Sequence, residues 1–329
     1  MRGNFSVEEL EIFMRRQAEA DEFSGAVLIA RDAKSIFEEA YGLASKRFNI
    51  PNRVDTKFNI GSLNKMFTKV AVTQLAEQGK LSFNDYIRQH LPDYPPEISN
   101  KVTIRHLLDH TSGMGHYWNE KFEASKSRLR TVDDFLRLFI DEPLSFKPGE
   151  KFQYSNAGYV VLGKIVEVAS RQDYYDYMRE RIYKPAGMND TGHYEMDIPV
   201  PNLAIGYTRT GSEGRLETGL RRENTFLVGL KGSPAGGGHS TVEDLLKFYV
   251  ALRSYKLLSP KYTDIVLPDT RIPDKEKKRV TSLAGGAPGV AAIFEMYHGL
   301  GYTVIILSNY DPPTVEPVRK KISEMIISK

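Results

Sequence analysis

Strand-length apolar segments stand near the two ends of the chain, and a mainly helical pattern separates them. Residues 25–31 and 34–41 read as strands joined by Asp32-Ala33, which is a hairpin signal. Residues 290–297 and 303–308 read as a second pair of strands. The two ends of the chain must therefore meet to build one antiparallel sheet.

Helical patterns lie outside both strand pairs. Ser6, with Glu9 three residues later, forms a capping box that opens a helix reaching about residue 20. Another helix is expected over residues 315–327. Helices at both termini would cover one face of the sheet. The sequence therefore predicts an α+β fold with an antiparallel sheet flanked by N- and C-terminal helices.

The middle of the chain predicts a mainly helical domain inserted into the sheet domain. The expected helices cover residues 81–91, 103–110, 131–140, 157–170 and 174–183, and one more begins at Thr241. We assign residues 1–61 and 230–329 to the sheet domain and residues 62–229 to the helical domain. The helix that begins at Ser62 would lie at their interface.

Composition restricts the classes of function. The chain has 329 residues, 41% hydrophobic and 26% charged, which is typical of a globular protein with one large or two ordinary domains. Its longest apolar runs are of strand length, so no membrane span is expected. A net charge of +3 is too small to indicate a nucleic-acid partner. The absence of cysteine excludes disulfides, thiolate metal sites and a cysteine nucleophile.

The compartment stays open at this stage. The first ten residues are polar and acidic and contain no apolar signal region. The chain is therefore expected to be either cytoplasmic or the mature form of an exported protein.

The first chemical motif is Ser62-x-x-Lys65. Gly61 ends a short strand-like segment and Ser62 opens a helix, so Ser62 and Lys65 share a face of its first turn. Free backbone N–H groups and the positive end of the helix dipole lie at that turn. A hydroxyl there has a nearby amine and donors for an oxyanion, as an acyl-transfer nucleophile requires. Taken alone, however, the pattern favours an ordinary serine cap.

Three further stretches add polar or flexible groups. Tyr154-x-Asn156 follows a Pro-Gly turn, so a phenol and a carboxamide can face one cleft; an Asx turn beside a core tyrosine is the simpler alternative. Residues 233–241 are rich in glycine, which lets the backbone approach a cleft closely. Within them, His239 either lines the cleft or only precedes a helix. Residues 285–290, Gly-Gly-Ala-Pro-Gly-Val, enter a strand.

The ordered set of these motifs resembles the serine beta-lactamase-like and penicillin-binding-protein-like hydrolases. The resemblance is strongest to class C beta-lactamases, D-alanyl-D-alanine peptidases and the carboxylesterases of the same fold, and it covers nearly the whole chain. Residues 102–113, 147–158 and 306–310 are also typical of that family. No single motif is specific, but their order is.

The resemblance implies a role for each matching residue. Ser62 would be the nucleophile, and Lys65 and Tyr154 would share the proton transfers. Free lysine and tyrosine titrate near ~10.4 and ~10, and in a shared cleft the two groups titrate as a unit, so the base is not assigned to either. Asn156 would bind the acyl side chain of a substrate. The backbone N–H groups of Ser62 and Gly286 would form the oxyanion hole.

The chain departs from the family pattern just before Gly286. The family has lysine or histidine, a small residue and glycine at the positions of Leu283, Ala284 and Gly285. Its cation usually helps to bind a substrate carboxylate. A strand rich in glycine and aromatic residues usually precedes this motif, and here a hairpin's worth of sheet is expected to be missing. Recognition of an anionic substrate is therefore in doubt, whereas ester hydrolysis suffers least.

Other polar and aromatic candidates carry less weight. His106 and His110 are spaced i,i+4 without the acid of a zinc-binding helix, so neither a metal nor another cofactor is expected. Tyr117 and Trp118 are either a substrate-side wall or satellite packing. Gly-x-Ser-x-Gly does not occur, which excludes the nucleophile elbow of α/β hydrolases.

Two classes of function remain open. The first is a serine hydrolase that works through an acyl-enzyme on small esters, amides or peptides, with true beta-lactamase or D-alanyl peptidase activity as the less favoured form. The second is a catalytically impaired relative that keeps the fold as a binding or scaffold module, which Leu283 and the shortened strand region motivate. The oligomeric state is left open.

Overall fold

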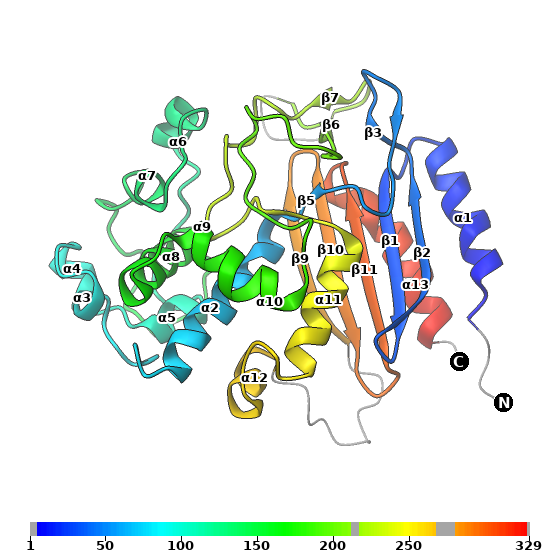
Figure 1. The fold of residues 1–329 in the computed structure, drawn as a ribbon. Helices are drawn as coiled ribbons and strands as arrows, with labels where there is room; N and C mark the ends of the chain where they lie inside the picture. Colours follow the sequence, from blue (N-terminus) through cyan, green and yellow to red (C-terminus); the bar gives the residue numbers. More distant parts are fainter. Residues whose placement is uncertain (1–4, 212–216, 268–279, 328–329) are drawn as a thin grey trace.

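Five antiparallel strands form the central sheet of the computed structural model, which describes residues 5–211, 217–267 and 280–327. The strand order is β2-β1-β11-β10-β9 (Figure 1). The strands are β1 (Gly25–Arg31), β2 (Lys34–Tyr41), β9 (Val280–Ala287), β10 (Val290–Tyr297) and β11 (Tyr302–Ser308). The predicted meeting of the two chain ends is confirmed, because β1 pairs with β11 along its whole length, with Val27 opposite Ile306.

The first hairpin forms where the sequence predicts it. Asp32 and Ala33 connect β1 to β2 with φ angles of 48° and 63°. Two successive residues with positive φ give a turn whose twist matches that of the flanking strands. The Asp-Ala pair therefore makes this connection although it lacks the glycine that favours such angles.

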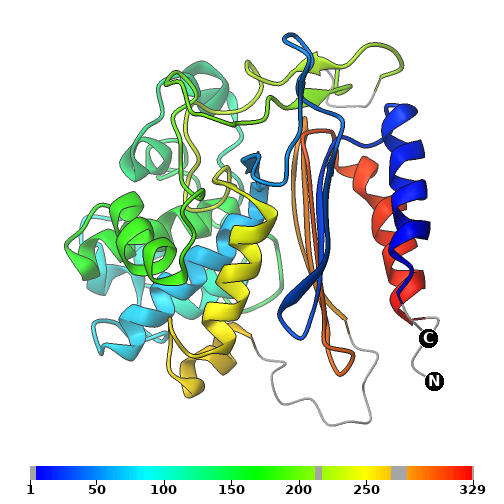
Figure 2. The same ribbon diagram turned by 45° about the vertical axis from the view of Figure 1, so that its right-hand side comes forward.

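Two terminal helices cover one face of the sheet, as the sequence predicts. They are α1 (Val7–Glu19) and α13 (Glu316–Ile327), and both lie on the same side in Figure 2. The Ser6 hydroxyl caps α1 by accepting a hydrogen bond from the Glu9 N–H. Leu10 of α1 and Ile322 of α13 pack with Val27 and Ile306 of the sheet in one buried cluster. The burial of this apolar surface holds the terminal helices on the sheet.

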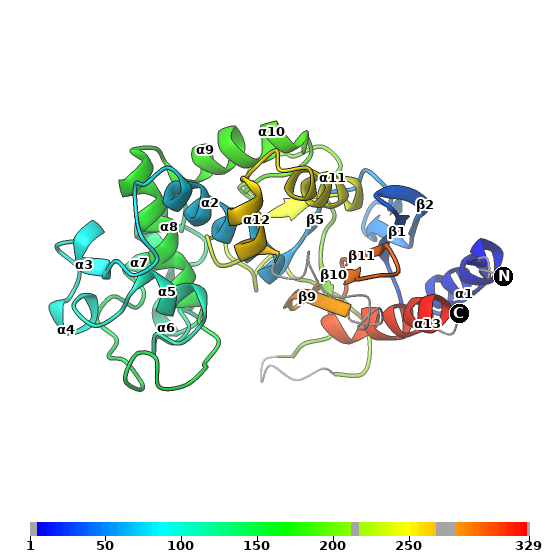
Figure 3. The ribbon, with the colours of Figure 1, turned by 90° about the horizontal axis from the view of Figure 1, so that it is seen from below.

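The other face of the sheet packs against the helical part of the molecule. Leu28 of β1 and Ile305 of β11 belong to a second buried cluster, which includes Leu245 of α11 (Val242–Arg253) and Val70 of α2 (Lys65–Glu77). Figure 3 shows α11 and α2 on the side of the sheet opposite α1 and α13. One continuous apolar core therefore joins the sheet to the helical region.

Short elements make up the rest of the described chain. The helices are α3 (Ile87–His90), α4 (Pro96–Ser99), α5 (Ile104–Leu108), α6 (Glu120–Ser125), α7 (Val132–Leu136), α8 (Asn156–Ser170), α9 (Tyr174–Met178), the π-helix η2 (Arg179–Tyr183), α10 (Lys184–Ala186), α12 (Pro260–Val266), and the 3₁₀ helices η1 (Gly61–Asn64) and η4 (Pro312–Val315). The short strands are β3 (Leu43–Ser45), β4 (Ile50–Pro51), β5 (Phe58–Asn59), β6 (Tyr207–Thr208), β7 (Arg222–Glu223) and β8 (His239–Ser240). Within the described ranges, none of the helices has the length and apolarity that crossing a membrane requires.

The helix predicted over residues 81–91 is wrong for most of its length, because only α3 (Ile87–His90) forms there. The backbone before α3 pairs with another segment instead: the Arg105 N–H donates to the Phe83 carbonyl, and the Ile104 N–H donates to the Asp85 carbonyl. These long-range hydrogen bonds replace the local ones that a helix would make. The helix predicted over 131–140 is likewise short, since α7 ends at Leu136.

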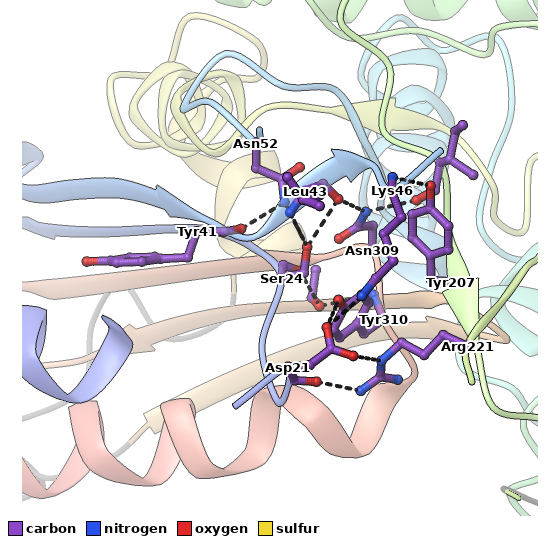
Figure 4. Close-up of polar contacts among 12 residues, drawn as sticks. Asp21, Ser24, Tyr41, Leu43, Lys46, Asn52, Tyr207, Arg221, Asn309 and Tyr310 are labelled. Carbon is purple, nitrogen blue, oxygen red and sulfur yellow. Dashed lines mark hydrogen bonds and ion pairs between the residues drawn. The ribbon is translucent and has the colours of Figure 1, made fainter. Parts of the chain in front are cut away.

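A polar network at one end of the sheet ties a distant segment to it (Figure 4). Asp21 accepts hydrogen bonds from the Tyr310 hydroxyl and, at 2.7 Å, from the Lys46 ammonium group. The Arg221 guanidinium donates to the Asp21 carbonyl at 3.0 Å and lies 3.7 Å from the centre of the Tyr310 ring. The Tyr207 hydroxyl accepts from the Lys46 N–H at 2.6 Å. The segment that carries β6 and β7 is thereby fixed to the sheet.

Candidate active site

Ser62 lies on a tight turn between β5 and α2. This turn is the 3₁₀ helix η1, and the α-helix begins only at Lys65. Gly61 has a φ of 50°, its N–H donates to Asn59 Oδ1 at 2.9 Å, and its carbonyl accepts from the Gly237 N–H at 3.3 Å. The capping alternative for Ser62 is wrong, since the N-cap positions of η1 and α2 are Ile60 and Asn64.

Lys65 is buried beside Ser62, and its ammonium group contacts neutral oxygen atoms. Lys65 Nζ lies 3.3 Å from Ser62 Oγ and 2.7 Å from Asn156 Oδ1, and it also donates to the Ala235 carbonyl. The side chain is only 7% exposed, and this burial lowers the pKa of Lys65 from 10.5 to about 7. Near neutral pH a large fraction of the amine is therefore uncharged and able to accept a proton.

Tyr154 brings its phenol to the same point. Its hydroxyl hydrogen-bonds with Ser62, and Lys65 Nζ lies 4.8 Å from the centre of its ring. Burial raises the pKa of Tyr154 above its ordinary value, and the Ser62 hydrogen bond opposes that shift. The His110 imidazole stacks on the Tyr154 ring with a centroid distance of 4.6 Å and on Tyr159 at 5.1 Å. The phenol is therefore held in place by ring packing.

Asn156 is the first residue of α8, and its carboxamide joins two neighbours. Its Oδ1 atom accepts from Lys65, and its Nδ2 atom lies 3.2 Å from Nδ1 of His116. Ser155 caps α8 by accepting from the Gly158 N–H at 2.9 Å. The start of this helix therefore fixes where the Asn156 side chain begins.

The glycines of β9 let the edge strand approach the backbone of Ser62. A Cβ atom on Gly285 would lie 2.1 Å from the Ile60 carbonyl oxygen and 2.8 Å from the Ser62 nitrogen. A Cβ on Gly61 would lie 2.8 Å from the Gly286 nitrogen. No side chain fits between these segments, so the backbones of Ser62 and Gly286 lie close together, as an oxyanion hole requires. That role for the two N–H groups stays a prediction.

Leu283 stands two residues before Gly285 on the same edge strand. It lies opposite Phe294 of β10, is half-buried and packs against the larger apolar cluster. It is not among the described residues that line the pocket beside Ser62. The strand itself begins at Val280, and residues 268–279 lie outside the described part of the chain. The prediction that a hairpin is missing before Leu283 falls on those residues.

A pocket opens beside Ser62 and Asn156, and most of its wall is apolar. Residues from several parts of the chain line it, among them Tyr117, Trp118, Phe122 and Phe135 from the helical region, Tyr194, Met196, Asn224, Leu227, Val228, Leu230 and Lys231 from the long connection after α10, and Gly286 to Val290 from the sheet. Tyr117 and Trp118 therefore line the pocket, and the buried Tyr117 ring also packs against Phe135 at 5.4 Å. Both alternatives stated for this pair describe part of the observed arrangement.

His239 lies in β8 and lines the pocket, opposite Asn59 of β5. It is 3% exposed, and no hydrogen-bond partner contacts its Nδ1 atom. Burial lowers the pKa of His239 to about 4, so this imidazole is neutral near pH 7. The following helix is capped by Thr241, which accepts from the Asp244 N–H.

The two histidines considered for a metal make backbone contacts instead. Nδ1 of His106 accepts from the Thr103 N–H at 3.2 Å, and Nδ1 of His110 accepts from the Ser155 N–H at 3.0 Å. Among residues 5–211, 217–267 and 280–327, no group of three or more histidine, aspartate or glutamate side chains has an arrangement that could hold a metal ion.

Several residues in and around the site were missed by sequence reasoning. The connection that supplies Met196 and Leu227 has no periodic pattern that would mark it as a wall. His116 gave no signal beyond its place shortly after Thr111-Ser112-Gly113. His110 was considered only as a metal ligand, whereas it supports Tyr154.

The sheet, the helical region and the meeting of serine, lysine and tyrosine between them define a serine beta-lactamase-like or penicillin-binding-protein-like class of protein. The family model described as Beta-lactamase matches residues 11–323, and the chain belongs to this family. The predicted α+β fold and the family resemblance are therefore confirmed.

Relatives agree with this assignment. Penicillin-binding protein 4* of Bacillus subtilis (strain 168) is 30% identical over 328 residues, which cover 93% of this chain and 72% of the relative. The structure of a penicillin-binding protein from Bacillus halodurans has a TM-score of 0.81 at 30% identity and covers 95% of this chain and 99% of its own. The D-amino acid amidase from Ochrobactrum anthropi SV3, complexed with L-phenylalanine amide, shares the fold with a TM-score of 0.76 at 21% identity, over 97% and 98% of the chains. This membership supports hydrolase activity of the serine type in general.

Proposed function

We propose that the protein is a serine hydrolase that cleaves uncharged esters or small amides through an acyl-enzyme on Ser62. The observation that carries this proposal is the position of Lys65, whose Nζ lies 3.3 Å from Ser62 Oγ. Burial holds the pKa of this amine at about 7. A nucleophile next to a base that is partly neutral at physiological pH is the arrangement that covalent catalysis requires.

Acylation in this site would involve two proton transfers, the first from Ser62 to Lys65 and the second to the leaving alcohol. The neutral Lys65 amine takes the Ser62 proton as the oxygen attacks the substrate carbonyl carbon. The ester C–O bond then breaks, and the proton passes through the Tyr154 phenol to the leaving alcohol. The N–H groups of Ser62 and Gly286 would hold the negative oxygen of the tetrahedral intermediate. Water then cleaves the acyl-enzyme with the same groups acting in reverse.

Lys65 is favoured over Tyr154 as the group that first accepts the proton. Burial moves the two pKa values in opposite directions: the lysine falls to about 7, whereas the tyrosine rises above its ordinary value. Near pH 7 the lysine can therefore be neutral, while the phenol keeps its proton and is able to donate it. The motifs alone left this choice open.

The pocket wall favours an uncharged, apolar acyl group. Among the described residues that line the pocket, Lys231 is the one with a charged side chain, and its ammonium group pairs with Glu195 at 3.2 Å. Trp118 is 55% exposed and stacks nearly parallel to Phe122, so it offers apolar surface to a ligand. Leu283 supplies no cation for a carboxylate. The amidase relative was complexed with L-phenylalanine amide, whose aromatic ring is a group of the kind that such a wall accepts.

The test is a panel of p-nitrophenyl esters from acetate to hexanoate and phenylacetate, together with a chromogenic cephalosporin. We expect Ser62-dependent turnover that favours the larger neutral acyl groups, with little cephalosporin hydrolysis. Mass spectrometry of the quenched enzyme should show an acyl adduct on Ser62. Undiminished turnover in Ser62→Ala, or no adduct with any substrate, would overturn the proposal and favour a binding or scaffold role.

A second candidate is beta-lactamase or D-alanyl peptidase activity, which the similarity to penicillin-binding protein 4* favours. Both activities require recognition of a substrate carboxylate, and Leu283 stands where the family pattern has a cation. Cephalosporin turnover that exceeds ester turnover and depends on Ser62 would favour this candidate. A gain in that turnover on Leu283→Lys would show that the missing cation limits it.

A further inference from the structure

His116 is in contact with the proposed catalytic lysine through a single side chain. Asn156 Nδ2 lies 3.2 Å from His116 Nδ1, and Asn156 Oδ1 accepts from Lys65 Nζ at 2.7 Å. The carboxamide therefore has a defined direction, with its nitrogen toward the imidazole and its oxygen toward the amine. An amide has no other way to satisfy a donor and an acceptor on opposite sides.

The backbone on both sides of His116 is anchored to the walls of the site. The Gly115 carbonyl accepts from the Ser155 hydroxyl at 3.0 Å and from the Ala157 N–H at 3.2 Å. The buried Tyr117 hydroxyl lies 2.9 Å from Ser233 Oγ. The imidazole is thus presented to Asn156 from a fixed segment, although the residue itself is exposed.

We propose that His116 is a positioning residue that orients Asn156 toward Lys65 while the imidazole is neutral and releases it when the imidazole is protonated. The kinetic part of this proposal rests on the proposed hydrolase function. Neutral His116 accepts at Nδ1 and carries its proton on Nε2. Protonated His116 has a hydrogen on Nδ1, which would face the Asn156 NH₂ group as donor against donor.

Turning the amide over does not relieve this conflict. The NH₂ group would then face the Lys65 ammonium group, which is charged at the acidic pH where His116 gains its proton. Protonation of His116 and the observed direction of Asn156 therefore exclude each other. Loss of the Asn156 contact also frees the Lys65 amine to move away from Ser62.

The charges that face His116 act in the same direction. Partial burial lowers the pKa of His116, and the field of the Lys65 cation, on α2, lowers it further. The Tyr154 ring, from the loop before α8, lies 6.1 Å away. His110, from the segment after α5, is neutral because burial lowers its pKa to about 4. The neutral form of His116 is therefore the one that the site favours.

A titration by NMR tests the contact without any substrate. The imidazole signal of His116 is assigned by its loss in His116→Asn and followed from pH 4 to 8 in the wild type, Asn156→Ala and Lys65→Met. We expect the pKa of His116 to rise in Asn156→Ala, because the donor to its neutral form is gone, and to rise in Lys65→Met, because the cation is gone. An unchanged titration in Asn156→Ala would overturn the proposal.

The kinetic test compares two substitutions of His116, one of which keeps a hydrogen-bond acceptor for Asn156 while the other removes it. His116→Asn keeps an acceptor near Nδ1 that cannot be protonated, whereas His116→Ala removes the acceptor. For a neutral ester at pH 8, we expect kcat/KM within about threefold of the wild type for Asn and about five- to tenfold lower for Ala, the loss of roughly one hydrogen bond. His90→Asn, on α3 outside the pocket, is the matched control and should change neither value.

The fall of kcat/KM at acidic pH distinguishes a role of His116 in orienting Asn156 from a role in packing alone. On the acid side we expect log kcat/KM of the wild type to fall more steeply than that of His116→Asn, which should fall with a slope of one for Lys65 alone. Equally steep acid limbs in the wild type and His116→Asn, or wild-type kinetics in His116→Ala, would overturn the proposal. Activity that survives in Ser62→Ala would instead overturn the hydrolase function, and the NMR titration would still decide the role of His116.

Discussion

At the scale of single residues, the chemistry of the site depends on burying one lysine that pairs with no acid in the described part of the chain. Lys65 is almost fully buried, and its hydrogen-bond partners are a hydroxyl, an amide oxygen and a backbone carbonyl. An adjacent carboxylate would hold the amine in its charged form, whereas burial alone favours the neutral form. The burial of Lys65 among neutral partners therefore keeps part of this amine uncharged, and able to act as a base, near neutral pH.

The lowered pKa of Lys65 predicts the direction in which kcat/KM changes with pH. The pKa of Lys65 is lowered from 10.5 to about 7, so the amine gains a proton as pH falls through about 7. We expect kcat/KM for a neutral ester to rise with pH through this value and to level off above it. Initial rates between pH 5 and pH 9 measure the limb, and a flat profile across pH 6 to 8 would contradict it.

Substitution of the same lysine provides the companion test. Arginine stays protonated at any accessible pH, so Lys65→Arg should lower kcat/KM by roughly 10² to 10⁴, the usual contribution of a general base. Lys69→Arg, one turn further along α2 and outside the pocket lining, is the matched control and should stay near wild type.

The sequence predicted the individual catalytic candidates better than their surroundings. Ser62, Lys65, Tyr154 and Asn156 could be named because family motifs mark them, and their side chains do meet in the structure. The stack of His110 on Tyr154 could not be found, because a ring contact between residues 44 positions apart leaves no local pattern. The fixed direction of Asn156 is likewise a property of three separate segments.

At the scale of elements, the wall of the pocket is held by charges at the end of the sheet. Asp311, 2% exposed, accepts from the Thr208 hydroxyl at 2.6 Å, the Arg209 N–H at 2.8 Å and the Gly289 N–H at 2.9 Å, and lies 3.7 Å from the Arg221 guanidinium. One carboxylate therefore joins β6, the residues before β7 and the β9–β10 turn.

We expect Asp311→Asn to lower the free energy of unfolding by about 3 kcal/mol, because it removes one of the two carboxylates that pair with the buried Arg221 guanidinium and places an NH₂ group against backbone donors. It should also raise KM more than it lowers kcat, since the wall moves while Ser62 and Lys65 stay in place. Urea unfolding and steady-state kinetics measure the two effects.

Asp55→Asn is the matched control for this substitution. Asp55 forms an exposed ion pair with Arg53 at 2.9 Å, and such pairs contribute about 0 to 1 kcal/mol. Equal destabilisation by the two substitutions would show that the buried network does not hold the wall.

The errors in the predicted elements have a common physical cause. The expected helix over 81–91 has acceptable local propensity, but its backbone hydrogen bonds go to residues 102–105 instead. Of the elements that formed as predicted, α8 and α11 have buried apolar residues at helical spacing, and β10 is buried along its whole length. Periodicity indicates burial, and segments whose partners are distant loops do not show it.

At the scale of the whole molecule, the boundary between sheet and helical region is filled with apolar side chains. The larger core cluster includes Leu28 and Phe294 from the sheet, Phe67 from α2 and Val160 from α8. The assignment of residues 62–229 to a separate domain stays a prediction about chain organisation. A shared core implies that neither part keeps its stability when the other unfolds.

We therefore expect one cooperative unfolding transition. Differential scanning calorimetry of the full chain should give a calorimetric enthalpy equal to the van't Hoff enthalpy, and fluorescence of Trp118 in the helical region should follow the same curve as far-UV circular dichroism. Two resolved transitions, or loss of the tryptophan signal well before the circular dichroism signal, would show that the two parts unfold independently.

The packing of α1 against α13 has a practical consequence for presenting the molecule on a support. Glu9 and Lys321 join these helices by an ion pair, and both helices cover the face of the sheet turned away from the helical region (Figure 2). A linker joined to the start of α1 or to the end of α13 would begin on the face of the sheet opposite the helical region. Immobilisation through either one should therefore leave the entrance facing the bulk liquid, where substrate arrives freely.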